Sequence, residues 1–151
     1  MHQESARPLA LVAVVLLAGC GPAPSPAKAD PTSEAWYSQT VQQLNELNRE
    51  AERSLADGKS DTASAAILRG QPLEQRLLSP VHPTLAATEA ASDLDRLYGR
   101  MLLANRHYGW ARLMFQKNLG RWRTWRPEND ESRRRLQQAK DDIAACDRAM
   151  Q

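Results

Sequence analysis

Histidine, cysteine and phenylalanine are scarce in this chain of 151 residues, which has three histidines, two cysteines and one phenylalanine. The few histidines and cysteines include no pair spaced as in a zinc site and no Cys-x-x-Cys-His sequence for haem attachment. A Gly-x-Ser-x-Gly nucleophile motif and a glycine-rich phosphate loop are also missing. We therefore expect no metal or other cofactor, and no enzymatic activity.

A long hydrophobic run is missing as well. The apolar run from Leu9 to Leu17 has nine residues, whereas a transmembrane helix needs about 20. A short apolar core that follows Arg7 and precedes small residues is typical of a signal peptide. The N-terminus is therefore predicted to direct export rather than to span a membrane.

The residues Leu17-Ala18-Gly19-Cys20 resemble the lipobox of bacterial lipoprotein precursors. The resemblance implies that residues 1–19 are a lipoprotein signal peptide and that acyl chains on Cys20 attach the mature protein to a membrane of the cell envelope. Gly21, in place of an aspartate, implies the periplasmic face of the outer membrane rather than the inner membrane, if the host is Gram-negative. The alternative is an ordinary secretory signal that ends in an unrelated cysteine.

A tether and one domain follow the signal peptide. Residues 20–31 contain the lipidated cysteine and are rich in proline and alanine, so they are predicted to stay extended at about 3.1 Å per residue. Residues 32–151 suit a single α-helical domain. Within it, Cys146 falls on an apolar helix face and is expected to be a small buried hydrophobe; an intermolecular disulfide is the alternative.

Apolar residues recur every three to four positions and predict helices throughout this domain. The first helix should follow Asp30-Pro31 and end at Asp57-Gly58. A second should begin near Ser60 and be kinked or broken at Gly70-Gln71-Pro72.

Three more helices are predicted after the prolines of residues 79–83. They should run from about Thr84 to Asn105, from near Tyr108, and from a cap near Asn129 to Met150. No stretch alternates with period two, so no sheet is expected.

Small residues occur where paired helices would meet. Gly99 in one helix and Ala111 and Phe115 in the next are similar to the tetratricopeptide pattern, and Ala51 and Ala63 repeat it weakly in the earlier hairpin. The resemblance implies antiparallel helical hairpins that offer a surface to partners. The fold class is therefore all-α, either tetratricopeptide-like or an irregular bundle of four to five helices.

Charge is unevenly distributed along the domain: residues 99–135 hold ten Lys or Arg and three acids, whereas residues 34–95 hold ten acids and five bases. The basic part contains a segment that alternates arginine and tryptophan. Its candidate binding residues are Arg121, Trp122, Arg123, Trp125 and Arg126. The alternative is that the tryptophans pack under the last helix and the arginines are simply solvated.

Two functions remain open. The first is a membrane-anchored envelope lipoprotein that acts as a helical interaction module for another envelope protein. The second is a binder of peptidoglycan, lipopolysaccharide or another anionic polymer or lipid through the arginine and tryptophan residues. Export makes nucleic acid an unsuitable partner for that basic surface.

Overall fold

The structure is a computed structural model that describes residues 30–151. The predicted signal peptide, the predicted acylation site at Cys20 and the predicted tether up to residue 29 lie outside the described residues. The described part contains one 3-10 turn, five α-helices and no strand, so the all-α fold class is confirmed. The elements are η1 (Pro31–Ser33), α1 (Ala35–Ala56), α2 (Ser60–Leu77), α3 (Leu85–Ala104), α4 (Tyr108–Thr124) and α5 (Asp130–Ala149).

Several helix ends lie where the capping residues predicted them, although Asp30 caps the 3-10 turn η1 and α1 begins only at Ala35. Gly58, which follows α1, takes the left-handed conformation with φ of 71°. The Thr84 side chain accepts a hydrogen bond from the first turn of α3. At the start of α5, Asn129 and Ser132 form a reciprocal capping box. Local side-chain chemistry therefore fixes where these helices begin and end.

The predicted break at Gly70-Gln71-Pro72 is wrong, because α2 continues through these residues to Leu77. Pro72 lies on the exposed side of the helix. Proline cannot donate the helical hydrogen bond to the carbonyl of Leu68, but on an exposed face water can take its place. Packing of the buried side of α2 against the rest of the domain outweighs this local loss.

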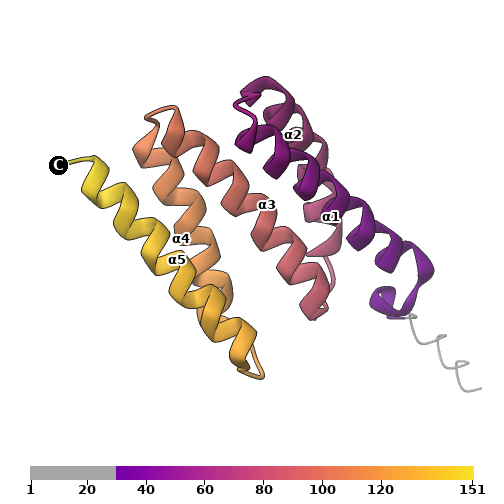
Figure 1. The fold of residues 1–151 in the computed structure, drawn as a ribbon. Coiled ribbons are helices and arrows are strands. Elements are labelled where there is room, and N and C mark those ends of the chain that lie inside the picture. The colour runs from indigo at the N-terminus through magenta and orange to yellow at the C-terminus, as the bar shows by residue number, and fades with distance from the viewer. Residues whose placement is uncertain (1–29) are drawn as a thin grey trace, which may run out of the picture.

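The helices form stacked hairpins (Figure 1). Helices α1 and α2 pair with each other, and α3 packs against both of them. Helix α4 returns along α3, and α5 packs along α4 as the last layer. The predicted antiparallel hairpins are therefore present, with α3 as the central helix.

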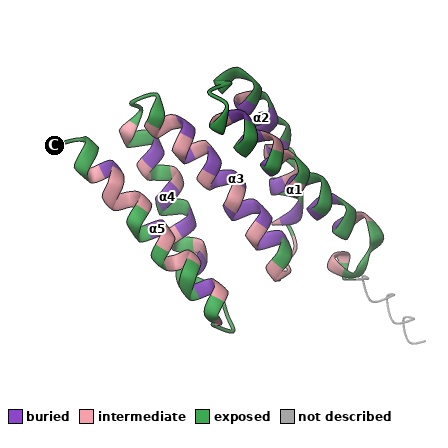
Figure 2. Ribbon diagram, viewed as in Figure 1, coloured by how far each residue is buried: buried purple, intermediate pink, exposed green. Residues whose placement is uncertain are grey.

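Buried residues follow the inner side of every helix (Figure 2). The larger apolar cluster joins α1, α2 and α3 and includes Tyr37, Leu44, Ile67 and Leu94. A smaller cluster of Ala111, Phe115 and Cys146, with Leu102, Leu103 and Ile143 packed against it, joins α3, α4 and α5. Met150, the C-cap of α5, is 50% exposed because it follows the last turn, beyond Cys146.

The predicted contact between small and aromatic residues occurs in the second hairpin. A Cβ atom at Gly99 would lie 2.5 Å from Cε1 of Phe115, so only glycine lets α3 and α4 approach this closely. Ala111, one turn before Phe115, is fully buried at the same contact.

Candidate functional site

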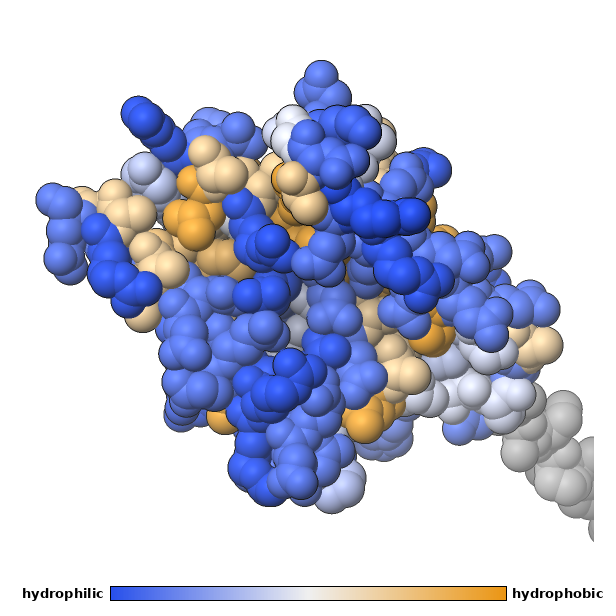
Figure 3. Space-filling view, viewed as in Figure 1, coloured by the Kyte–Doolittle hydropathy of each residue, from blue (hydrophilic) through white to orange (hydrophobic). Residues whose placement is uncertain are grey.

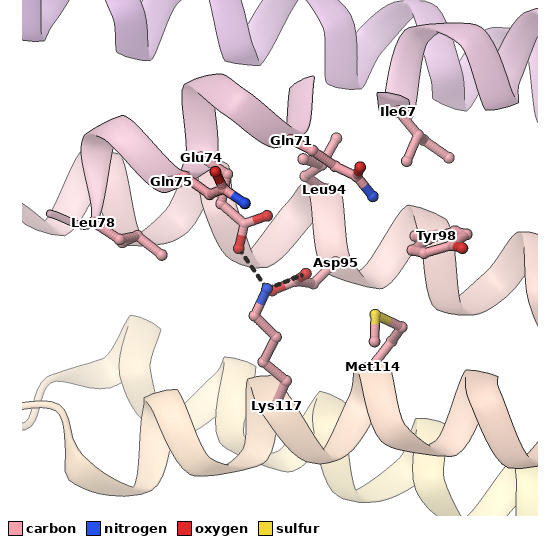
Figure 4. Close-up of a pocket in the computed structure, with 10 residues that line it drawn as sticks. All are labelled: Ile67, Gln71, Glu74, Gln75, Leu78, Leu94, Asp95, Tyr98, Met114 and Lys117. Atoms are coloured by element: carbon pink, nitrogen blue, oxygen red, sulfur yellow. Dashed lines mark hydrogen bonds and ion pairs between the residues drawn. The ribbon is translucent and has the colours of Figure 1, made fainter. Parts of the chain in front are cut away.

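A groove lies between the hairpins, with α2 and α4 as its walls and α3 as its floor (Figure 4). Its volume is about 510 Å³. We call it the inter-hairpin groove. It is lined by Ile67, Gln71, Glu74, Gln75 and Leu78 of α2 and its C-cap, Leu94, Asp95 and Tyr98 of α3, and Met114 and Lys117 of α4. Figure 4 shows these side chains converging on the space between the helices.

Helical spacing assigns the residues of α4 to two faces. Ala111, Phe115, Asn118 and Trp122 repeat every three to four residues and are buried against α3. A second row, which also has three- and four-residue steps, faces the side of α2. It consists of Trp110, Met114, Lys117, Arg121 and, after the helix, Trp125. The alternation in the sequence therefore reflects two helix faces rather than one continuous surface.

Four charged side chains meet at the centre of the groove. The Nζ atom of Lys117 lies 2.7 Å from Oε1 of Glu74 and 2.8 Å from Oδ1 of Asp95. Arg121 donates through Nη2 to the same two carboxylates, at 3.2 and 2.9 Å. Its Nη1 donates to Oδ1 of Asn118 at 2.6 Å. Two cations thus neutralise two carboxylates that are almost fully buried.

Burial and the neighbouring Asp95 raise the pKa of Glu74 above its ordinary value, although both cations oppose this. Burial alone would lower the pKa of Lys117, but its hydrogen bonds to Asp95 and Glu74 outweigh burial and raise it. Lys117 therefore stays charged at neutral pH, and Glu74 takes up a proton more readily than an ordinary glutamate does.

The arginines and tryptophans of the predicted binding segment differ in burial and in pairing. Trp122 is 3% exposed and its indole nitrogen donates to Oγ of Ser92 at 2.8 Å, so this side chain is part of the core. The Arg121 side chain is only 12% exposed and is paired as described above. Trp125 is half-buried, and only Arg123 and Arg126 are exposed.

The acidic and basic parts of the sequence pair with each other or locally. Of the ten bases in residues 99–135, seven form ion pairs: Arg100, Arg112, Lys117, Arg121, Arg133, Arg134 and Arg135. The other three, Arg106, Arg123 and Arg126, have no carboxylate within ion-pair distance among the described residues. The acidic and basic parts of the uneven sequence therefore largely neutralise each other within the domain.

A second pocket, with a volume of about 360 Å³, meets the inter-hairpin groove at Leu78. We call it the loop pocket, because the connections from α2 to α3 and from α4 to α5 contribute to it. Its lining is Leu78, Val81, His82, Pro83, Thr88, Arg121, Thr124, Trp125 and Arg126. It therefore contains three of the five predicted binding residues.

Three further features concern metal binding, membrane spanning and the free cysteine. No group of three metal-ligating side chains occurs in residues 30–151, and no helix there has the length and hydropathy of a membrane span. Cys146 is fully buried, as expected of a small hydrophobe, and burial raises the pKa of its thiol. Its possible intermolecular disulfide stays an untested alternative.

Comparison with protein-family models, with curated proteins and with solved structures finds no match for this chain.

The groove was missed at the sequence level because Glu74 and Lys117 are 43 positions apart and nothing local connects them. A usable signal did exist for Trp122. Continuing the spacing of Ala111 and Phe115 by three and four residues reaches Asn118 and Trp122, which predicts that Trp122 is internal.

Proposed function

We propose that this protein is a lipid-anchored component of a bacterial envelope whose helical domain binds another protein along the inter-hairpin groove. The observation that carries the proposal is a groove that opens between two helices bearing exposed apolar side chains. Acyl chains on Cys20 would hold the domain at the membrane, at the periplasmic face of an outer membrane where the host has one.

Exposed apolar residues are concentrated on the helices that form the groove walls. Leu68 of α2 is 60% exposed, and Trp110 and Leu113 of α4 are 65% and 49% exposed. Tryptophan is among the residues that contribute most to protein interfaces. By contrast, the side formed by α1, α3 and α5 is mainly hydrophilic, with smaller apolar patches (Figure 3).

The centre of the groove offers polar partners as well. Gln71 and Gln75 project from α2 into it (Figure 4). Apolar contacts with a few fixed polar groups suit specific protein recognition.

The dimensions favour a helix as the bound element. The groove-lining residues of α2 and its C-cap run from Ile67 to Leu78, a wall of about 16 Å at 1.5 Å per residue, which matches about three turns of a partner helix. An amphipathic helix that lies in a groove with its apolar residues inward is a common mode of recognition.

The alternative function, binding of an anionic polymer through a broad basic surface, has less support. Trp122 is internal and Arg121 is paired, so Arg123 and Arg126 are the two arginines of the predicted segment that are exposed. Such binding should weaken steeply with salt, whereas a packed protein interface should depend on its apolar residues.

Site-specific photo-crosslinking in the native cells tests the interaction. A photoreactive residue replaces Leu68 or Gln75 at the groove, and Gln42 or Gln137, both exposed on α1 and α5, provide matched controls. We expect one discrete cross-linked protein from positions 68 and 75, which persists in high salt and is absent from the control positions. Equal products from all four positions, or no product at the groove, would contradict the proposal.

Membrane attachment is tested separately by mass spectrometry of the mature N-terminus and by fractionation. Acyl chains should be found on Cys20, and Cys20→Ser should release the protein from the membrane fraction or leave it unprocessed. A mature chain that begins at another residue without lipid would contradict the lipoprotein assignment and leave the groove proposal standing.

A further inference from the structure

The loop pocket has an unusual lining, because none of its nine residues is acidic. Arg121 and Arg126 approach it from α4 and the following loop, and His82 from the connection between α2 and α3. Arg121 is held by Glu74 and Asp95, so Arg126 is the cation of this lining that has no ion pair in the described structure, although the chain as a whole has nearly balanced charge.

Several hydrogen-bond donors in this pocket have no acceptor among the described residues. Arg126 uses Nη1 to donate to the carbonyls of Arg123 and Trp125, at 3.2 and 2.6 Å, which leaves Nε and Nη2 unused. Trp125 has a covered indole nitrogen without an acceptor. The Arg126 donors are open to solvent, whereas the Trp125 indole nitrogen is covered, and buried donors are nearly always paired in folded proteins. These donors suit a ligand that only accepts hydrogen bonds.

The location of the loop pocket in the fold suggests the source of such an acceptor ligand. The Tyr37 hydroxyl accepts from the amide of Thr84 at 3.3 Å and donates to the carbonyl of Leu77 at 2.9 Å, which ties the start of α1 to the loop beside the pocket. In Figure 1 the start of α1, the start of α3 and the loop before α5 lie at the same end of the molecule. The described chain thus begins at the end that holds the pocket.

We propose that the loop pocket binds the phosphate of a phospholipid headgroup, an inference that rests on the lipid anchor of the proposed function. A tether from Cys20 brings this end of the domain toward the bilayer. A phosphate accepts hydrogen bonds from arginine forks and indole N–H groups without offering a donor in return. Val81, which lines the pocket and is 88% exposed, then faces the apolar side of the headgroup region.

The proposal concerns one headgroup rather than a broad anionic surface. Asp30 and Glu34 flank the turn η1, and Glu128 and Asp130 lie around the start of α5, where both pair with Arg133. These acids weaken long-range attraction to an anionic bilayer, so recognition depends on the donors inside the pocket. The bound phosphate would orient the domain relative to the membrane.

The test uses the mature acylated protein in maltoside micelles, which contain no phosphate. Dihexanoyl phosphatidylglycerol, dihexanoylglycerol and inorganic phosphate are titrated separately, and indole N–H resonances are followed by NMR, with Trp125→Phe to assign Trp125. We expect the phospholipid to shift the Trp125 resonance and the phosphate-free lipid to leave it unchanged. Arg126→Gln should weaken the binding about tenfold, as for loss of a charge-assisted hydrogen bond.

Arg123→Gln is the matched control, because Arg123 is exposed, lacks an ion pair and does not line the pocket. This variant should bind within twofold of the unmodified protein. Equal weakening by both substitutions, or an unchanged Trp125 resonance, would overturn the proposal. If inorganic phosphate bound as tightly as the phospholipid, the pocket would be a site for free phosphate and the lipid assignment would fail.

Different results would overturn the groove proposal and the phospholipid proposal. Arg126→Gln should leave cross-linking from positions 68 and 75 unchanged, because Arg126 does not line the groove. A groove without a partner would leave the phospholipid titration as expected, whereas an N-terminus without acyl chains would remove the argument for a lipid headgroup.

Discussion

The two halves of the domain are joined to the central helix α3 in different ways. Helices α1 and α2 share with α3 an apolar cluster of twelve buried residues. On the other side, α4 and α5 share only three fully buried cluster residues. Ion pairs supplement that smaller cluster: Arg96–Asp142 and Arg135–Asp93 join α3 to α5, and Arg112–Asp147 joins α4 to α5.

This difference explains the uneven charge of the sequence. The first half also has ion pairs, Arg69–Glu50 and Arg100–Glu52, but their side chains are more exposed than those of Arg96–Asp142. Where the apolar cluster is small, partly buried ion pairs add specificity of position more than free energy. The basic second half is thus matched to acids within the domain. The comparison predicts that each half responds to a different kind of substitution.

Phe115→Ala should have the largest effect, because Phe115 is the only large aromatic side chain in the smaller cluster. Its removal should lower the free energy of unfolding by about 3–5 kcal/mol. Urea denaturation followed by circular dichroism measures this. Leu113→Ala, at an exposed position of the same helix, should change it by less than about 0.5 kcal/mol. An equally small effect of Phe115→Ala would mean that α4 and α5 do not depend on this core.

Arg121→Met should have the second-largest effect on the free energy of unfolding, because it leaves Glu74 and Asp95 buried with Lys117 as their remaining cation. Removal of one member of a buried ion pair costs about 3–5 kcal/mol, and the half-exposed Lys117 should reduce this to about 3. The matched control is Arg123→Met, at an exposed position without an ion pair, which should be close to neutral. If both variants unfolded at the same urea concentration, the cluster would contribute no net stability.

Two glycine substitutions sharpen the picture of the contact between α3 and α4. Gly99→Ala places a methyl group 2.5 Å from Phe115 and should destabilise the fold by about 1–3 kcal/mol. Gly120→Ala meets nothing within 4 Å on the exposed side of α4 and should stabilise it by about 0.5–1 kcal/mol. Thermal melts of the two variants should therefore shift in opposite directions, and a shift in the same direction would contradict the close approach.

The pH dependence of the free energy of unfolding should show the effect of burying the Glu74 carboxylate. Because the pKa of Glu74 is raised above 4.5, the folded protein binds its proton more tightly than the unfolded chain does, and stability falls as pH rises above 4.5. Glu131 affects the free energy of unfolding at lower pH, below 4.5. Hydrogen bonds from Arg134 and Arg135 lower its pKa to about 2, so its contribution is lost as pH falls from 4.5 toward 2.

Glu74→Gln should flatten the decrease of stability above pH 4.5 and leave the acid limb unchanged, as measured by urea denaturation at a series of pH values. Glu89, whose pKa is also raised chiefly by burial, accounts for a further part of the same limb. Glu89→Gln serves as the comparison. A steeper decrease in the Glu74→Gln protein would reverse the sign assigned to this group.

The sequence allowed the helices and most of their ends to be predicted, because caps such as Asn129 and turn formers such as Gly58 act over a few residues. Pro72 was misjudged because tertiary packing of α2 overrides a local penalty. The contact of Gly99 with Phe115 was predicted from the resemblance in spacing. The inter-hairpin groove could not be predicted, because it depends on how α2 and α4 lie relative to α3.

The sequence by itself determined an all-helical domain and most of its turns, since these depend on residue type and short-range spacing; the signals at its N-terminus stay a prediction. Only the tertiary structure decided which charges are available to a partner. Arg121 and Arg126 are five positions apart, yet one is held by Glu74 and Asp95 and the other has no carboxylate partner in the described structure. The physical reason is that burial and pairing are set by neighbours far away in the chain, which a linear run of arginines does not reveal.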